Sequence, residues 1–121
     1  MILPAAVLAL TILTGSVTHY SPGVMDRVYA NRLAWRHVAP CPQCIGMVAL
    51  LDREHVGDLA YIRRPGQPTE GPFLIVDCAA AADRERLRYR GLVAEVDYAT
   101  AARWDTARRP IHDITVIVLS R

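Results

Sequence analysis

The feature that most restricts the fold is a series of short, apolar, β-prone segments separated by turn residues. Clusters such as Ser21-Pro22-Gly23 and Pro65-Gly66-Gln67-Pro68 interrupt the chain where a strand has to stop. The segments with this character are 17–20, 45–51, 59–62, 72–78, 92–96 and 111–119. An open sheet of six short strands exposes unpaired edges, and a closed barrel removes them. The sequence therefore predicts a mainly β fold, a small six-stranded barrel.

Two short helices are expected to accompany these strands. Residues 79–90 are rich in helix-forming residues and stop before Gly91, a residue type that favours the position after a helix. A second helix is predicted to begin at Asp97, which can cap its first turn. The segment 24–42 shows no clean hydrophobic period, so we expect a long loop there.

Length and charge limit the classes of function. The 121 residues suffice for one domain, and an apolar content of 52% is enough for a buried core. All 14 basic residues are arginines, and they are spread among 12 acidic residues to give a formal charge of +2. Nucleic-acid-binding proteins gather basic residues on one surface. We therefore expect solvated charged faces and no nucleic-acid partner.

The N-terminal residues 1–16 have the character of an export leader. An apolar run over 2–13 is followed by the small residues Thr14, Gly15 and Ser16, although no arginine or lysine precedes the run. A span of a bilayer needs roughly 20 residues, and this run is shorter. We predict a signal peptide or hydrophobic leader over 1–16 and a mature domain over 17–121, secreted or in the cell envelope, without a stable membrane span. A membrane-lying anchor and a misplaced start are the alternatives.

Three cysteines, Cys41, Cys44 and Cys78, are compatible with an oxidising compartment. One disulfide is the favoured outcome, with the third thiol left over and the pairing open. The alternatives are inert or free thiols, or a zinc site in which His37 or His55 completes the ligands. We predict no resident metal and no cofactor.

Asp77 is the candidate catalytic residue. It interrupts the apolar strand segment 72–78, where partial burial would raise the pKa of a carboxyl group and let it act as a general acid. In the alternative interpretation, backbone amides or one of the many arginines satisfy its charge and leave it unreactive. A two-carboxylate hydrolase would need a second acid, and Asp97 is the obvious one unless it only caps a helix.

Several other side chains are candidates for substrate binding. Tyrosine and tryptophan rings stack on sugars but also fill small cores, and a strand histidine can partner either a substrate or a carboxylate such as Asp77. The candidate substrate-binding residues are His19, Tyr20, Tyr29, Trp35 and Asp97.

Four short segments of the chain together resemble one known family. The motifs lie at 17–23, 45–58, 73–78 and 95–102, and they cover most of the chain after the leader. They resemble the double-psi β-barrel domain of the rare lipoprotein A family, which is related to expansins and barwin-like domains. In that family an aspartate at the end of a barrel strand is associated with cleavage or loosening of wall polysaccharide, and Asp77 is the matching position. Cys78-Ala79-Ala80 replaces the Arg-Gly-Pro-like turn that usually follows it.

The resemblance implies an exported, cell-wall-active domain that acts as a monomer on peptidoglycan or another polysaccharide. The implied activity is that of a lytic transglycosylase, in which Asp77 alone serves as general acid and base. A non-catalytic polysaccharide-binding module is the first alternative, because the turn after Asp77 is altered and a histidine of some family members is absent. A small disulfide or zinc protein is the second.

Overall fold

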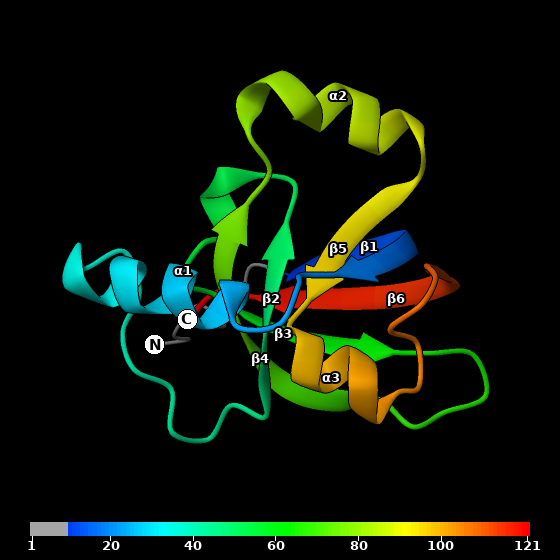
Figure 1. The fold of residues 1–121 in the computed structure, drawn as a ribbon, viewed down its shortest axis with the longest axis horizontal. Coiled ribbons are helices and arrows are strands. Elements are labelled where there is room, and N and C mark those ends of the chain that lie inside the picture. The colour runs from blue at the N-terminus through cyan, green and yellow to red at the C-terminus, as the bar shows by residue number, and fades with distance from the viewer. Residues whose placement is uncertain (1–9) are drawn as a thin grey trace, which may run out of the picture.

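The computed structural model describes residues 10–121 and has a closed β-barrel at its centre (Figure 1). Around the barrel the strands follow the order β1-β5-β2-β4-β3-β6. Their bounds are β1 Leu10–His19, β2 Gly46–Leu50, β3 Leu59–Arg63, β4 Glu70–Cys78, β5 Leu92–Val96 and β6 Ile111–Leu119. The prediction of a small six-stranded barrel is confirmed.

Parallel and antiparallel pairs are mixed in this barrel. β1 pairs with β5 in parallel and β2 pairs with β4 in parallel, whereas the other four neighbouring pairs are antiparallel. Every strand has two partners, so the closed sheet offers no free edge for aggregation. In residues 10–121 the α-helices lie in the connections from β1 to β2, from β4 to β5 and from β5 to β6, each of which joins strands that are not neighbours in the barrel.

Alternate side chains of the strands fill the barrel interior. Fully or almost fully buried members of this core are Val17, Val48, Leu50, Ile62, Phe73, Ile75, Val96, Ile114, Val116 and Val118. A second apolar cluster lies on the outside of β2 and β4, where Ala49, Leu74 and Val76 pack against Met25. The barrel wall between β2 and β4 is therefore buried on both faces.

Strand β1 begins well before the predicted start of the mature domain at residue 17. Residues Leu10 to Gly15 pair with β6, from Leu10 opposite Leu119 to Gly15 opposite Ile114. Part of the predicted leader thus belongs to the barrel, and its remaining part, residues 1–9, lies outside the described residues. A processed protein that keeps this fold has to be cut before Leu10.

Within residues 10–121, three α-helices surround the barrel rather than two. The predicted helices are present as α2, Ala81–Tyr89, and α3, Tyr98–Arg103. The prediction of a long loop over 24–42 is wrong, because Val24–Ala34 forms α1. Its inward side chains, which include Met25, Val28, Tyr29 and Leu33, pack on the outer cluster at helical spacing. In residues 10–121, no helix has the length and apolar character to cross a membrane.

Candidate functional site

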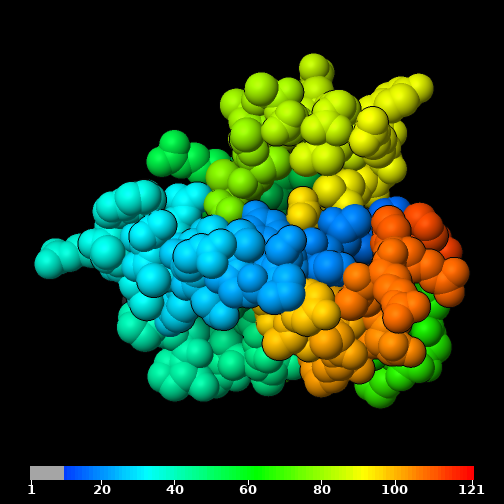
Figure 2. Space-filling model, viewed as in Figure 1, coloured from blue at the N-terminus to red at the C-terminus, as the bar shows by residue number. Residues whose placement is uncertain are grey.

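A hollow beneath α2 is the surface feature closest to the predicted catalytic residue. It is a cavity of about 190 Å³, and the surface dips at this place between α2 and α1 (Figure 2). Its walls come from the barrel and from α2, and they include Tyr20, Ala49, Cys78, Asp83, Leu87 and Glu95. We call this hollow the α2 cavity.

A larger cavity, of about 320 Å³, lies on the other side of α2. Ile12, Leu51 and Val93 give it a largely apolar wall, with Asp52 and Arg88 beside them. None of the predicted catalytic or substrate-binding residues is among its described lining residues. The α2 cavity is therefore the better candidate site.

A bulge in β4 sets the direction of Asp77. Val48 pairs with Ile75, but the next residue of β2, Ala49, pairs with Asp77, so Val76 is an extra residue in β4. Without this bulge Asp77 would follow Ile75 in the inward-facing series, because side chains alternate along a strand. The bulge instead places Asp77 on the outer row beside Ala49, where a carboxylate can reach solvent and other side chains.

Asp77 is held by two side chains. The Tyr20 hydroxyl donates to Asp77 Oδ2 at 2.7 Å, and the Arg32 guanidinium donates to Oδ1 at 3.0 Å. Side-chain exposure is only 21% for Asp77 and 15% for Arg32, so the ion pair is largely shielded from solvent. Burial and the hydrogen bond to Asp77 raise the pKa of Tyr20 far above its usual value, which keeps its hydroxyl a donor. The arginine-paired alternative predicted for Asp77 is the arrangement present.

Glu95 is the carboxyl group that sequence reasoning did not single out. Ala49 pairs with Asp77 on one side and with Glu95 of β5 on the other, so the two acids share one outer row. Burial raises the pKa of Glu95 and the charge of Asp77 raises it further, while a Thr18 hydrogen bond and His19 oppose the rise. The sequence could have identified Glu95 as a candidate, because this acid interrupts the apolar strand segment Leu92–Val96 as Asp77 interrupts its own strand.

We expect Glu95→Gln to flatten the dependence of stability on pH. Because the folded state raises the pKa of Glu95, it binds this proton more tightly than the unfolded chain does. The resulting stabilisation is complete below the ordinary glutamate value of about 4.3 and is lost as pH rises through the folded-state value. Melting temperatures between about pH 4 and about pH 8 should therefore fall for the wild type relative to Glu95→Gln. The melting temperature of the control Glu85→Gln, a change at an exposed residue, should depend on pH as that of the wild type does. If the melting temperature of the wild type instead rises relative to that of Glu95→Gln as pH increases, the assignment is contradicted.

His19 does not partner Asp77, which corrects one sequence-based expectation. Its Nδ1 lies 2.9 Å from the carbonyl oxygen of Tyr20, and its Nε2 lies 2.9 Å from that of Ala107. The ring also meets Tyr98 edge-on, with 5.6 Å between ring centroids. These contacts tie the end of β1 to the segment before β6, so His19 has a structural role there.

The two aromatic residues predicted on the 24–42 segment lie away from the α2 cavity. Tyr29 is half-buried in the outer cluster under α1. Trp35 follows α1 with 64% of its surface exposed, and its ring centroid is 5.7 Å from that of His37. Arg32 donates to Nδ1 of His37 as well as to Asp77, so a chain of side chains joins this exposed ring to the site.

Asp97 is a buried helix cap and not a surface residue that binds substrate. Its side chain accepts from the Thr100 amide at 3.3 Å, from the Thr100 hydroxyl at 2.7 Å and from the Met47 amide at 3.0 Å. Only 9% of the residue is exposed. The helix-cap alternative therefore describes its role, and the cap also joins α3 to β2.

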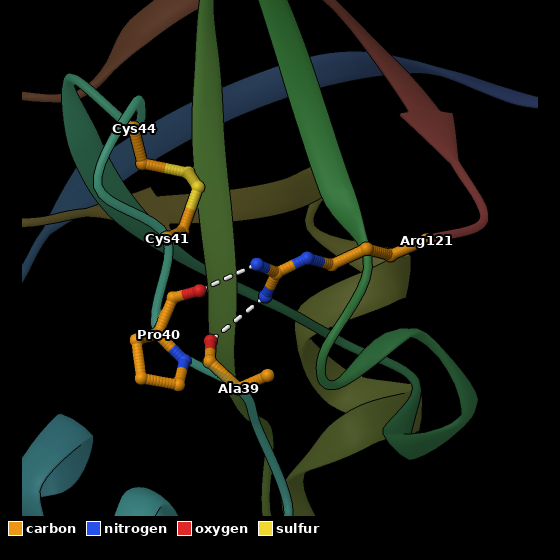
Figure 3. The surroundings of a disulfide bond; sticks show 5 residues. All are labelled: Ala39, Pro40, Cys41, Cys44 and Arg121. Carbon is orange, nitrogen blue, oxygen red and sulfur yellow. Dashed lines mark hydrogen bonds between the residues drawn. A yellow bond between two sulfur atoms is a disulfide. The ribbon is translucent and has the colours of Figure 1, made fainter.

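The cysteines form one disulfide, as predicted, and it joins Cys41 to Cys44 (Figure 3). Cys78 is free. The bridge closes a short loop before β2, and the Arg121 guanidinium donates to the carbonyl oxygens of Ala39 and Pro40 just before it. With two sulfurs bonded to each other, the three cysteines cannot act together as zinc ligands. The zinc alternative built on all three is wrong for this state.

One other cluster brings possible metal ligands together. Asp52, Glu54 and His55 place a ligand atom each within 4.8 Å of one another. However, Arg88 donates to Asp52 Oδ1 at 2.8 Å, and the Arg84 Nε lies 3.7 Å from the same atom. Two guanidinium groups already neutralise this carboxylate, so we assign no metal to the cluster.

Comparison with known proteins does not identify the chain. No family model matches it, and neither a curated protein nor a solved structure matches it. Function therefore has to be inferred from the barrel, the α2 cavity and the residues around it.

Proposed function

We propose that this protein is an exported domain of the cell envelope that cleaves the glycan strands of peptidoglycan by lytic transglycosylase chemistry. The observation that supports this most is the pair of carboxyl groups, Asp77 and Glu95, that flank Ala49 beside the α2 cavity. Neighbouring strands lie about 4.8 Å apart, which puts the two Cα atoms at a distance on the order of 10 Å. Acid–base cleavage of a glycosidic bond needs a carboxyl group in a partly desolvated hollow, and this row supplies one.

The barrel itself supports the proposal. A closed six-stranded barrel with two parallel strand pairs is compatible with the double-psi topology that the sequence resemblance implies. The residues after Asp77 depart from the family's turn, and here they lead through Cys78 and Ala79 into α2, which forms one wall of the cavity. In our proposal, α2 and the segment that leads into it take the place of the family's turn and make the cavity narrower.

A non-catalytic polysaccharide-binding module is the second candidate. It is favoured by one observation, that both Asp77 oxygens already accept hydrogen bonds, from Tyr20 and Arg32. A carboxylate fixed in this way is poorly placed to exchange protons with a substrate. The exposed ring of Trp35 would supply a stacking surface for sugars in such a module.

Incubation with purified peptidoglycan, followed by mass spectrometry of the soluble products, tests the proposal. The protein should begin at residue 10, so that β1 is intact. We expect anhydro-muropeptides from the wild type and a clear decrease for Asp77→Asn, with the exposed Glu85→Gln as the matched control. A folded wild type that is retained on peptidoglycan but releases no fragments would replace the enzyme proposal with the binding module.

A further inference from the structure

We propose that Glu95 is the general acid and base of the α2 cavity, and that Asp77 is the positioning residue behind it. This inference rests on the proposed function, because it names the group that performs the same glycan cleavage. It differs from the sequence-based expectation, which gave the whole role to Asp77.

The position of the two acids relative to the cavity favours Glu95. Glu95 is one of the residues that line the α2 cavity, whereas Asp77 is not among the described lining residues. Tyr20 lines the cavity and its hydroxyl donates to Asp77, so Asp77 is joined to the cavity wall through this hydrogen bond. A substrate in the cavity would meet the carboxyl group of Glu95 first.

The hydrogen-bond partners of the two acids favour the same assignment. Arg32 pairs with Asp77, but no salt bridge involves Glu95 within residues 10–121. Each oxygen of Asp77 already accepts a hydrogen bond, one from Tyr20 and one from Arg32. A proton donor needs a carboxyl group that keeps its proton, and a half-buried acid without a guanidinium partner meets this need.

The groups that face Glu95 also favour a retained proton. They are Thr18, His19 and Tyr20 at the end of β1, Asp77 and Cys78 of β4, and Asp83 across the cavity on α2. Among these groups, the charge of Asp77 raises the pKa of Glu95 and His19 opposes the rise. Because Asp77 and Glu95 share one outer row and only the small residue Ala49 lies between them, the charge of Asp77 acts on Glu95.

The proposed step conserves protons and electron pairs. Glu95 gives its proton to the oxygen of the glycosidic bond, and the bond between this oxygen and the sugar C1 breaks with its electron pair moving to the oxygen. The C6 hydroxyl oxygen of the same sugar then bonds to C1, and its proton passes to the ionised Glu95. The products are an anhydro sugar and a free hydroxyl, and Glu95 returns to its starting state without water or a cofactor.

Rates of anhydro-muropeptide release as a function of pH test this assignment. Proton donation contributes about 10²- to 10⁴-fold to a rate, so Glu95→Gln should reduce release by at least about 100-fold while it remains folded. Asp77→Asn should cause a smaller decrease. Removal of the aspartate charge should also move the alkaline limb of the profile to lower pH, which loss of a merely structural contact would not do.

The outcomes separate this inference from the proposed function. If the wild type and Glu95→Gln release products equally while Asp77→Asn releases none, the assignment of Glu95 is overturned and the enzyme proposal stands. An unchanged alkaline limb in Asp77→Asn also contradicts the positioning role. A folded wild type that releases nothing overturns both proposals. Carbon-13 NMR titration of the Glu95 carboxyl group, with and without Asp77→Asn, checks the coupling without reference to activity.

Discussion

A chain that begins at residue 17 should fail to fold, whereas a chain that begins at residue 10 should melt cooperatively. Removal of residues 10–16 deletes six pairs between β1 and β6, from Leu10 opposite Leu119 to Gly15 opposite Ile114. Only the pair of Val17 with Ile111 would remain in this ladder. The barrel would then be open, with β6 exposed as a free edge.

The expected loss is comparable with the whole stability of a small domain. At about 1 kcal/mol for each lost hydrogen bond, six such bonds give a loss of roughly 6 kcal/mol, and a typical domain has only about 5–15 kcal/mol in total. The half-buried side chain of Leu13, which packs against the barrel core, is lost as well. The lost hydrogen bonds and the lost packing of Leu13 both lower the stability of the shorter chain.

Circular dichroism during heating and dispersion of the amide proton NMR spectrum measure this effect. The chain that begins at residue 10 is the matched control, because it differs only by the strand in question. If the chain that begins at residue 17 has the same melting temperature as the control, the barrel does not need the first half of β1. In that case the predicted boundary between leader and domain at residue 17 would stand.

The strands were predictable from the sequence because each is a short apolar segment bounded by turn residues. The segment Leu92–Val96 was predicted with the bounds that the structure shows, and so was Ile111–Leu119. The first half of β1 was missed because Leu10–Leu13 is apolar in the way a leader is apolar. Local composition cannot distinguish an export segment from a barrel strand when the deciding contact, with β6, lies about a hundred residues further along the chain.

Helix α1 was missed for a different reason. It begins after Gly23, whose φ of 77° lies in the left-handed region, and no side-chain cap marks its start. Val24, Ala30 and Ala34 are apolar as well as the residues that face the barrel, so apolar character is spread around the helix and the helical period is weak in the sequence. Packing on the outer cluster stabilises this helix, and such tertiary support outweighs local propensity.

The candidate site was only partly predictable. Asp77 was selected because it is an acid that interrupts an apolar strand, and Glu95 has the same feature. The sequence could not show that a bulge at Val76 turns Asp77 outward, or that Ala49 lies between the two acids. Register between strands distant in the chain is a property of the closed barrel, and it determines which acid faces the cavity.

Asp97→Ala should destabilise the protein without acting on any substrate contact. The change removes the cap of α3 and leaves the buried amide of Met47 without its acceptor. Loss of a cap costs about 0.5–2 kcal/mol, and an unsatisfied buried donor adds about 1–3 kcal/mol. We therefore expect the free energy of unfolding to fall by about 1.5–5 kcal/mol.

Urea denaturation measures this change, and the exposed Asp26 in the first turn of α1 provides the matched control through Asp26→Ala. Asp26→Ala should lie within about 0.5 kcal/mol of the wild type, as surface substitutions usually do. Retention on peptidoglycan at a temperature where Asp97→Ala is still folded should equal that of the wild type. Unchanged stability together with lost retention would instead place Asp97 in the binding site, because a buried cap can affect a ligand only through the fold that it supports.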